Sequence, residues 1–112
     1  MKVKQLDHLN LTVRSFDDTV EFYGRVFGFE IVEEAVKNGV RWGVIRSGEA
    51  MLCIYEHPKL EFLDRFALLE RGLHGVNHLA FRITDAKAWY IKDPTGYEIE
   101  VTAWNDDEIA FD

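Results

Sequence analysis

Two histidines and one glutamate stand where a divalent metal ion could bind. His8 and His78 each precede an alternating apolar stretch, and Glu100 lies on the polar side of a third such stretch. An ionised carboxylate in an apolar strand is costly to bury unless it is paired, solvated or bound to a metal. Two imidazoles and one carboxylate suit Fe²⁺, Mn²⁺ or a related divalent ion, and they leave coordination positions free for substrate. These residue types predict a metal site at His8, His78 and Glu100.

The three candidate ligands, and the other residues that could take part in chemistry, also have purely structural interpretations. A single histidine in a strand is more often a satisfied core residue than a ligand. Glu98 points to the same side of its strand as Glu100 and could replace it as a ligand. His57 and His74 flank a predicted linker helix in polar surroundings, and we expect both at the surface. Cys53 is expected to fill the core, since a free buried cysteine behaves as a small apolar residue.

An internal repeat favours the metal interpretation. Residues 6–9 match residues 76–79, and residues 47–52 match residues 95–100. The repeat makes His8 and His78 equivalent and predicts that Leu52 is the counterpart of Glu100. The alternative is chance similarity between two short windows.

The elements that must position these residues follow from local patterns. Residues 6–13 alternate between apolar and polar, which predicts a strand. Ser15 is a predicted helix N-cap and Gly28 the C-cap, with an apolar stripe at Phe16, Val20, Tyr23 and Phe27. Asn38-Gly39 predicts a hairpin. The order along the first half is therefore strand, helix, strand, strand, strand, with the last three at residues 29–36, 40–46 and 50–56.

The second half has a similar beginning and end. A linker helix is predicted over residues 60–71, then a strand over 75–83, and then two strands that flank the turn Asp93-Pro94-Thr95-Gly96. We expect one domain over residues 1–112. It divides into a first module at 1–56, a linker at 57–75, a second module at 76–103 and a tail at 104–112.

The second module is shorter than the first by the residues of a helix and a strand. The shortfall lies between Asp85 and Lys87, and it would leave the apolar face of Leu79, Phe81 and Ile83 uncovered. Our hypothesis is that a further segment belongs near residues 85–87. The alternative is a genuine deletion with a partner chain covering the face. An intact mass near 13.0 kDa would rule out the further segment.

Composition excludes several function classes. The 112 residues carry 13 basic and 20 acidic side chains and a net charge of −7, without a basic stripe, which argues against nucleic acid and anionic membranes as partners. No apolar run approaches the ~20 residues that span a bilayer. One cysteine excludes a disulfide framework within the chain. The N-terminus has no signal-peptide core, so we expect a cytoplasmic location.

Taken together, the motifs resemble the vicinal oxygen chelate superfamily of glyoxalases, bleomycin-resistance proteins, extradiol dioxygenases and fosfomycin-resistance enzymes. The resemblance rests on residues 7–9, 21–23, 27–29, 77–81 and 90–100. It implies an α+β fold in which paired βαβββ modules form an open cup of mixed β-sheet, here with an incomplete second module. It also implies a small-molecule substrate and a homodimer, with the cup formed within one chain or by exchange of modules between two.

The resemblance also separates the subfamilies. Lactoylglutathione lyases use four metal ligands, and the fourth would fall at Leu52, which disfavours them. His8, His78 and Glu100 match the three ligands of extradiol dioxygenases and of fosfomycin thiol transferases. Tyr90 matches the active-site tyrosine of the extradiol enzymes. We therefore expect a ring-cleavage dioxygenase with catalytic Tyr90 and Fe²⁺ or Mn²⁺, with Zn²⁺, Ni²⁺ and Co²⁺ as further candidates.

Two alternatives stay open. The extradiol pattern expects a histidine between Asp85 and Tyr90, where none stands, and the fosfomycin pattern expects a basic residue in 103–112, where none stands either. A non-enzymatic binder of the bleomycin-resistance type would use the cup as a trap for aromatic molecules. Its lining could include Trp42, Trp89 and Trp104, which are equally well explained as core, interface or tail anchors.

Overall fold

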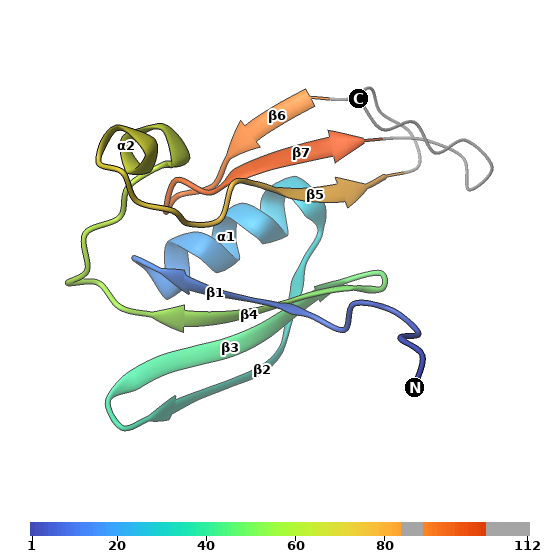
Figure 1. Cartoon of the computed structure of the whole chain (residues 1–112). Coiled ribbons are helices and arrows are strands. Elements are labelled where there is room, and N and C mark those ends of the chain that lie inside the picture. The colour runs from blue at the N-terminus through green and yellow to red at the C-terminus, as the bar shows by residue number, and fades with distance from the viewer. Residues whose placement is uncertain (84–88, 103–112) are drawn as a thin grey trace. The chain divides into compact units, whose positions relative to one another are not determined.

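The computed structural model describes residues 1–83 and 89–102 (Figure 1). The chain divides into two compact units, Met1–Phe62 and Leu63–Asp112, and each is described by itself. The first unit contains β1 (Leu9–Val13), α1 (Phe16–Phe27), β2 (Glu30–Lys37), β3 (Val40–Ser47) and β4 (Ala50–Glu56). The second contains α2 (Arg65–Glu70), β5 (Leu79–Arg82), β6 (Trp89–Lys92) and β7 (Glu98–Thr102). The predicted α+β class is confirmed.

The first unit is a four-stranded mixed sheet with one helix. The strand order is β1-β4-β3-β2, with β1 parallel to β4 and the other neighbours antiparallel (Figure 1). A helical crossover is what a parallel pair requires, and α1 supplies it. The order of elements is the one predicted from the sequence for the first module.

Local signals explain where α1 begins and ends. The Ser15 hydroxyl accepts a hydrogen bond from the Asp18 N–H at 3.2 Å, so Ser15 is the predicted N-cap. Gly28 ends the helix with φ of 71°, a left-handed conformation that costs glycine little. The apolar stripe is partly as predicted. Phe16 and Tyr23 are fully buried, and Thr19 and Phe22 are buried in place of Val20 and Phe27.

Phe16 and Gly43 determine how closely α1 approaches its sheet. A Cβ atom added at Gly43 would lie 2.8 Å from the Phe16 ring and 2.8 Å from the Glu33 carbonyl oxygen. Glu56 binds the start of the helix, because its Oε2 accepts the Phe16 N–H at 2.7 Å. A carboxylate there also interacts favourably with the positive end of the helix dipole. The helix is thereby attached to both β3 and β4.

The two faces of the first sheet differ. Leu11 and Val13 of β1 are buried toward α1, whereas Asn10 is exposed on the other face, as the alternation predicts. At the edge of the sheet, all eight residues of β2 are exposed, including Ile31 and Val32. The β2–β3 register shifts between Ile31 and Glu33, which is a β-bulge.

The second unit repeats this plan with fewer parts. Its three-stranded sheet has the order β5-β7-β6, with β5 parallel to β7 as β1 is to β4. Residues 14–39 lie between β1 and β3 and contain α1 and β2, but only residues 83–88 lie between β5 and β6. The second module is therefore incomplete, as predicted. The hypothesis of a further segment near 85–87 falls outside the described residues.

Some expectations for the second half need correction. The linker helix predicted over 60–71 is only α2, Arg65–Glu70, because Asp64 acts as its N-cap. The strand predicted over 75–83 is only Leu79–Arg82. On the apolar face predicted to be uncovered, Leu79 is buried and Phe81 and Ile83 are half-buried. The tail at 104–112 lies outside the described residues.

No helix among the described residues is long and apolar enough to cross a membrane.

Candidate metal site

The turn between β6 and β7 sets the start of the strand that carries Glu100. Asp93 is buried, and its Oδ1 atom accepts hydrogen bonds from the N–H groups of Thr95, Gly96 and Tyr97 at 2.9, 2.9 and 3.0 Å. One side chain thus satisfies three backbone donors, which makes this an Asx-type turn. Sequence reasoning assigned the turn to Pro94 and Gly96 and missed the part played by Asp93.

The register of the second sheet places Glu100 in the middle strand. Glu100 lies opposite Tyr90 of β6 and beside Ala80 of β5. Side chains alternate along a strand, so Glu100 shares a face with Ala80 and with His78, two residues before it. Ile99 and Val101 point the other way and are fully buried. The predicted polar face of β7 is confirmed at Glu98 and Glu100, which are half-buried, whereas Thr102 is buried.

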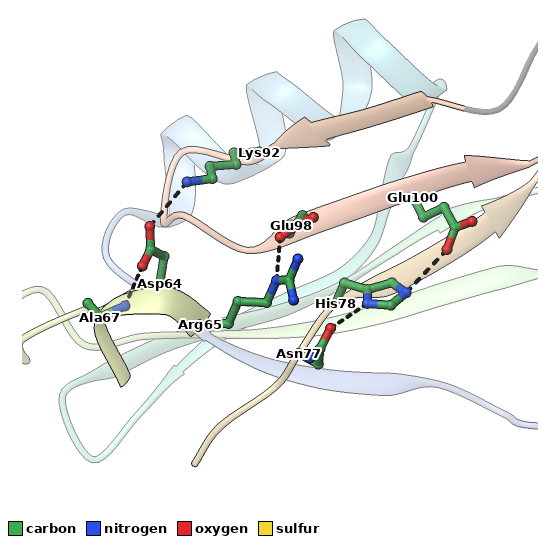
Figure 2. Close-up of polar contacts among 8 residues, drawn as sticks. All are labelled: Asp64, Arg65, Ala67, Asn77, His78, Lys92, Glu98 and Glu100. Atoms are coloured by element: carbon green, nitrogen blue, oxygen red, sulfur yellow. Dashed lines mark hydrogen bonds and ion pairs between the residues drawn. The ribbon is translucent and has the colours of Figure 1, made fainter. Parts of the chain in front are cut away.

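His78 and Glu100 lie in contact. The Nε2 atom of His78 is 3.2 Å from Oε2 of Glu100, and their side chains are 35% and 26% exposed. On the other side of the ring, Nδ1 of His78 is 2.6 Å from Oδ1 of Asn77 (Figure 2). The amide oxygen can only accept, so this contact places a proton on Nδ1. With Nδ1 as the donor to the amide oxygen, Nε2 faces the carboxylate, and the two atoms attract each other when a proton or a metal ion lies between them.

His8 has the same local arrangement in the first unit. Its Nδ1 atom lies 2.8 Å from Oδ2 of Asp7, the residue before it, and its side chain is 47% exposed. Holding Nδ1 in this way orients the ring and presents Nε2 as the ligand atom, which is how metal-binding histidines are commonly supported. Sequence reasoning missed Asp7 and Asn77 as supports. The signal was available, since each stands directly before the histidine in the matched windows.

Tyr90 is the third member of the cluster in the second unit. Its ring meets the His78 ring edge to face, with the centroids 6.1 Å apart. Partial desolvation of the phenol raises the pKa of Tyr90, and the Glu100 carboxylate raises it further by its charge and its hydrogen bond. Tyr90 is therefore a neutral hydrogen-bond donor near neutral pH, and the residue is 57% exposed. The structure brings together three of the four predicted site residues.

Glu98, the alternative ligand, has a different partner. Its Oε2 atom accepts from Nε of Arg65 at 2.8 Å, and only 15% of its side chain is exposed (Figure 2). Next to it, Nζ of Lys92 lies 3.2 Å from Oδ2 of Asp64. The Ala67 N–H donates to Oδ1 of Asp64 at 2.9 Å, and this bond and Lys92 lower the pKa of the Asp64 carboxyl. These contacts join α2 to the β6–β7 hairpin.

The predicted equivalence of Glu100 and Leu52 is wrong by one residue. Glu100 pairs with Ala80, and the residue that pairs with the matching Asn10 is Cys53. The pair Ser47–Ala50 encloses two residues, whereas the Asp93 N–H bonds to the Tyr97 carbonyl around three, so the second hairpin has one residue more. Cys53 is buried as predicted, and burial raises the pKa of its thiol.

The residue types in each unit are ones that bind divalent metal ions. In the second unit a carboxylate and a ring nitrogen face each other, and in the first unit His8 is supported by the residue before it in the same way as His78. Nitrogen and oxygen donors of this kind suit first-row divalent ions. Within the described part of either unit, no three side chains of His, Cys, Asp or Glu gather closely enough to hold a metal by themselves.

Comparison with known proteins decides the family. The family model described as Glyoxalase/Bleomycin resistance protein/Dioxygenase superfamily matches residues 5–92. The chain belongs to this superfamily. The match spans both histidines and Tyr90, and it confirms the resemblance seen in the sequence. No curated protein matches the chain at the level of sequence.

Solved structures of the superfamily share the fold. A glyoxylase/bleomycin resistance protein/dioxygenase domain from Frankia sp. EAN1pec aligns with a TM-score of 0.76 and 13% identity over 96% of each chain. A glyoxalase family protein from Enterococcus faecalis gives 0.70 and 18% identity over 88% of this chain and 96% of that one. The fosfomycin resistance protein FosX from Listeria monocytogenes, complexed with Mn(II) and sulfate, gives 0.72 and 17% identity over 96% and 98%.

Proposed function

We propose that this superfamily member is a divalent-metal-dependent enzyme acting on a small molecule, with His8, His78 and Glu100 as the metal ligands. The observation that carries the proposal is the contact between Nε2 of His78 and Oε2 of Glu100, with Asn77 holding the far side of the ring. The same support at His8, in the matched position of the repeat, is the reason for assigning it to the same ion. We also propose that the protein acts as a homodimer.

The ion we propose is Fe²⁺ or Mn²⁺, with Zn²⁺, Ni²⁺ and Co²⁺ as further candidates. When bound, such an ion supplies Lewis-acid polarisation of substrate oxygens and, in the case of iron, redox chemistry. The chain's own residues do the rest. Asn77 and Asp7 keep the rings of the two histidines in one orientation, and Tyr90 offers a phenolic proton beside Glu100.

The reaction we propose is extradiol-type cleavage of a catechol ring. Tyr90 supports it because a neutral phenol next to a ligand carboxylate can donate a hydrogen bond to an oxygen of a bound catechol. The raised pKa of Tyr90 keeps that proton in place at neutral pH. The open position of Tyr90, which is 57% exposed, leaves room for a substrate to reach it.

A fosfomycin-type metal-dependent thiol transferase is the second candidate. It is favoured by the similarity to the FosX structures, two of which contain Mn(II). A non-enzymatic small-molecule binder of the bleomycin-resistance type is the third. The His78–Glu100 contact speaks against it, since a binder without metal would not need that pair.

The first experiment measures metal content in protein purified anaerobically without chelator. Wild type is compared with His78→Ala and with His74→Ala, which removes an exposed histidine of the same unit. We expect one Fe or Mn per chain in wild type and in His74→Ala, and loss of the metal in His78→Ala. Background metal in all three proteins would overturn the enzymatic proposal and leave the small-molecule binder.

A second experiment separates the two reactions. Metal-loaded protein is incubated with catechols while dissolved oxygen is recorded, and separately with fosfomycin and small thiols while the free thiol is recorded. Oxygen uptake that depends on Tyr90 supports ring cleavage. Thiol consumption without oxygen uptake would replace ring cleavage with the transferase.

A further inference from the structure

A groove on the first unit is lined by none of the proposed metal ligands. It opens at the end of the β2–β3 hairpin and has a volume of about 380 Å³. Its lining consists of Lys37, Asn38, Val40, Trp42, Tyr55 and His57. This volume falls within the range of about 300–1,000 Å³ typical of small-molecule sites.

Two aromatic rings form one wall of the groove. Trp42 and Tyr55 face each other across β3 and β4, with centroids 6.0 Å apart and planes only 15° from parallel. A hydrogen bond between the Tyr55 side chain and the Cys53 sulfur helps fix the tyrosine. Both residues are half-buried, so part of the aromatic wall remains accessible. A flat ring can stack on such a wall at small conformational cost.

The rim of the groove is basic. Lys37 is exposed at the end of β2, and His57 is half-buried, with its backbone N–H bonded to the Val13 carbonyl at 2.9 Å. No acidic side chain lines the groove, although the chain as a whole carries a net charge of −7. The neighbouring Glu56 is engaged with the Phe16 N–H at the start of α1. The groove therefore favours an anion more than the rest of this acidic surface does.

The turn beside the groove holds its rim in place. Asn38 and Gly39 have φ values of 53° and 76°, as a two-residue type I′ hairpin requires. The turn pairs Lys37 with Val40. The backbone at Lys37 is therefore already ordered. Binding a ligand has to restrict only the side-chain rotamers of the lysine, which lowers the total entropy cost.

We propose that this groove is a binding subsite for a small planar aromatic acid, whose ring stacks on the accessible outer face of the Trp42–Tyr55 pair and whose carboxylate binds Lys37 and His57. Thr12 of β1 pairs with Tyr55, and by alternation His8 lies on the same face of the sheet, four residues earlier. The subsite thus lies on the face that carries a proposed metal ligand, roughly 13 Å along the strand. The proposal rests on the proposed function only for the statement that the bound acid is a substrate or product.

The test uses naphthoate as the probe and naphthamide as its uncharged counterpart. Binding to metal-free full-length protein is followed by the amide NMR signals of β2, β3 and His57. We expect saturable binding of both compounds, with naphthoate the tighter, and shifts confined to the groove. Decalin carboxylate, which keeps the charge and lacks the flat ring, should bind more weakly than naphthoate.

Matched variants identify the contacts. Lys37→Gln should weaken naphthoate roughly three- to tenfold and leave naphthamide unchanged, because only the charged contact is lost. Lys59→Gln, which removes an exposed lysine outside the groove, should change neither. Trp42→Leu should weaken both compounds. The amide spectrum shows whether each variant is folded, and Lys37 is exposed enough to be replaced without loss of the fold.

Three results would overturn the proposal. One is absence of saturable binding, the second is equal affinity of the Lys37→Gln and Lys59→Gln variants for naphthoate, and the third is shifts outside the groove. The use of metal-free protein separates this proposal from the proposed function. Saturable naphthoate binding with the expected effects of Lys37→Gln and Trp42→Leu supports the groove whether or not the metal experiment succeeds.

Discussion

Nε2 of His78 and Oε2 of Glu100 lie 3.2 Å apart on one face of a three-stranded sheet, while Asn77 binds the other nitrogen of the ring. A proton or a metal ion between the imidazole and the carboxylate would occupy the same place. Metal binding at such a site requires the neutral imidazole and releases a proton when the ring is charged. Asn77 and Asp7, which stand directly before the two histidines, hold Nδ1 of each ring and so determine how Nε2 is presented.

Removing the support of the rings should weaken metal binding without removing a ligand. We expect Asn77→Ala and Asp7→Ala each to lower metal affinity by about 10- to 100-fold, because the ring loses its fixed orientation. Competition with a chromogenic chelator measures the affinity. Glu70→Ala, which changes an exposed residue of the unit that contains Asn77, serves as the control. Wild-type affinity in both support variants would show that these contacts do not act on the metal.

Tyr90 should ionise above the usual tyrosine range. Burial and Glu100 raise its pKa in the folded state, so the stabilising contact is present below the ordinary value near 10 and is lost as pH rises through the folded value. Subtracting the tyrosinate absorbance of Tyr90→Phe from that of wild type isolates this one of the four tyrosines. A bound divalent cation should move the ionisation to lower pH, since it offsets the charge of Glu100. A pKa of Tyr90 in the ordinary tyrosine range, measured without metal, would contradict the hydrogen bond between Tyr90 and Glu100.

The attachment of α2 to the hairpin should be sensitive to acid. The Ala67 N–H and Lys92 lower the pKa of Asp64, so its contribution to stability is present above the ordinary value near 4 and is lost as pH falls through the lower folded value. The protection factors of the α2 amides against hydrogen exchange, measured through this pH range, should fall in wild type. In Asp64→Asn they should already be low at neutral pH. A protection profile of the variant that follows wild type would disprove the role of the ion pair.

Gly43 should tolerate no side chain. Gly43→Ala places a Cβ atom against the Phe16 ring and the Glu33 carbonyl oxygen, each at 2.8 Å, and we expect it to lower the free energy of unfolding by about 1–3 kcal/mol. Denaturant titration measures the loss. Combining it with Phe16→Leu removes the ring and tests the coupling. Strictly additive losses would show that the ring is not the obstacle.

Local signals explain what could be predicted of the fold. The Ser15 cap, the Gly28 C-cap and the Asn38-Gly39 turn depend on backbone conformations that only a few residue types favour, so the chain itself specifies them. The length of α2 was not predictable in this way. Its start depends on Asp64, whose carboxylate also binds Lys92, a residue far along the chain.

The sequence predicts which residues form the candidate site but not the strand register that places them. Residue types and the repeat indicate His78 and Glu100, the family resemblance indicates Tyr90, and the structure places these three together. The repeat predicts Leu52 as the counterpart of Glu100, one residue from the correct position, because two short matching windows do not reveal the length of a turn. The strand pairing shows that the counterpart is Cys53.

The exposed edge strand β2 has a consequence for the behaviour of the protein in concentrated solution. Ile31, Val32 and Val36 would make it a template for adding strands from other copies, and such edges lead to aggregation. The bulge after Ile31 breaks the flat edge, and the carboxylates of Glu33 and Glu34 repel an identical strand. Charge repulsion is screened by salt. High ionic strength, as in salting-out or crystallisation, is therefore the condition in which copies should first begin to associate through β2, beyond the proposed homodimer.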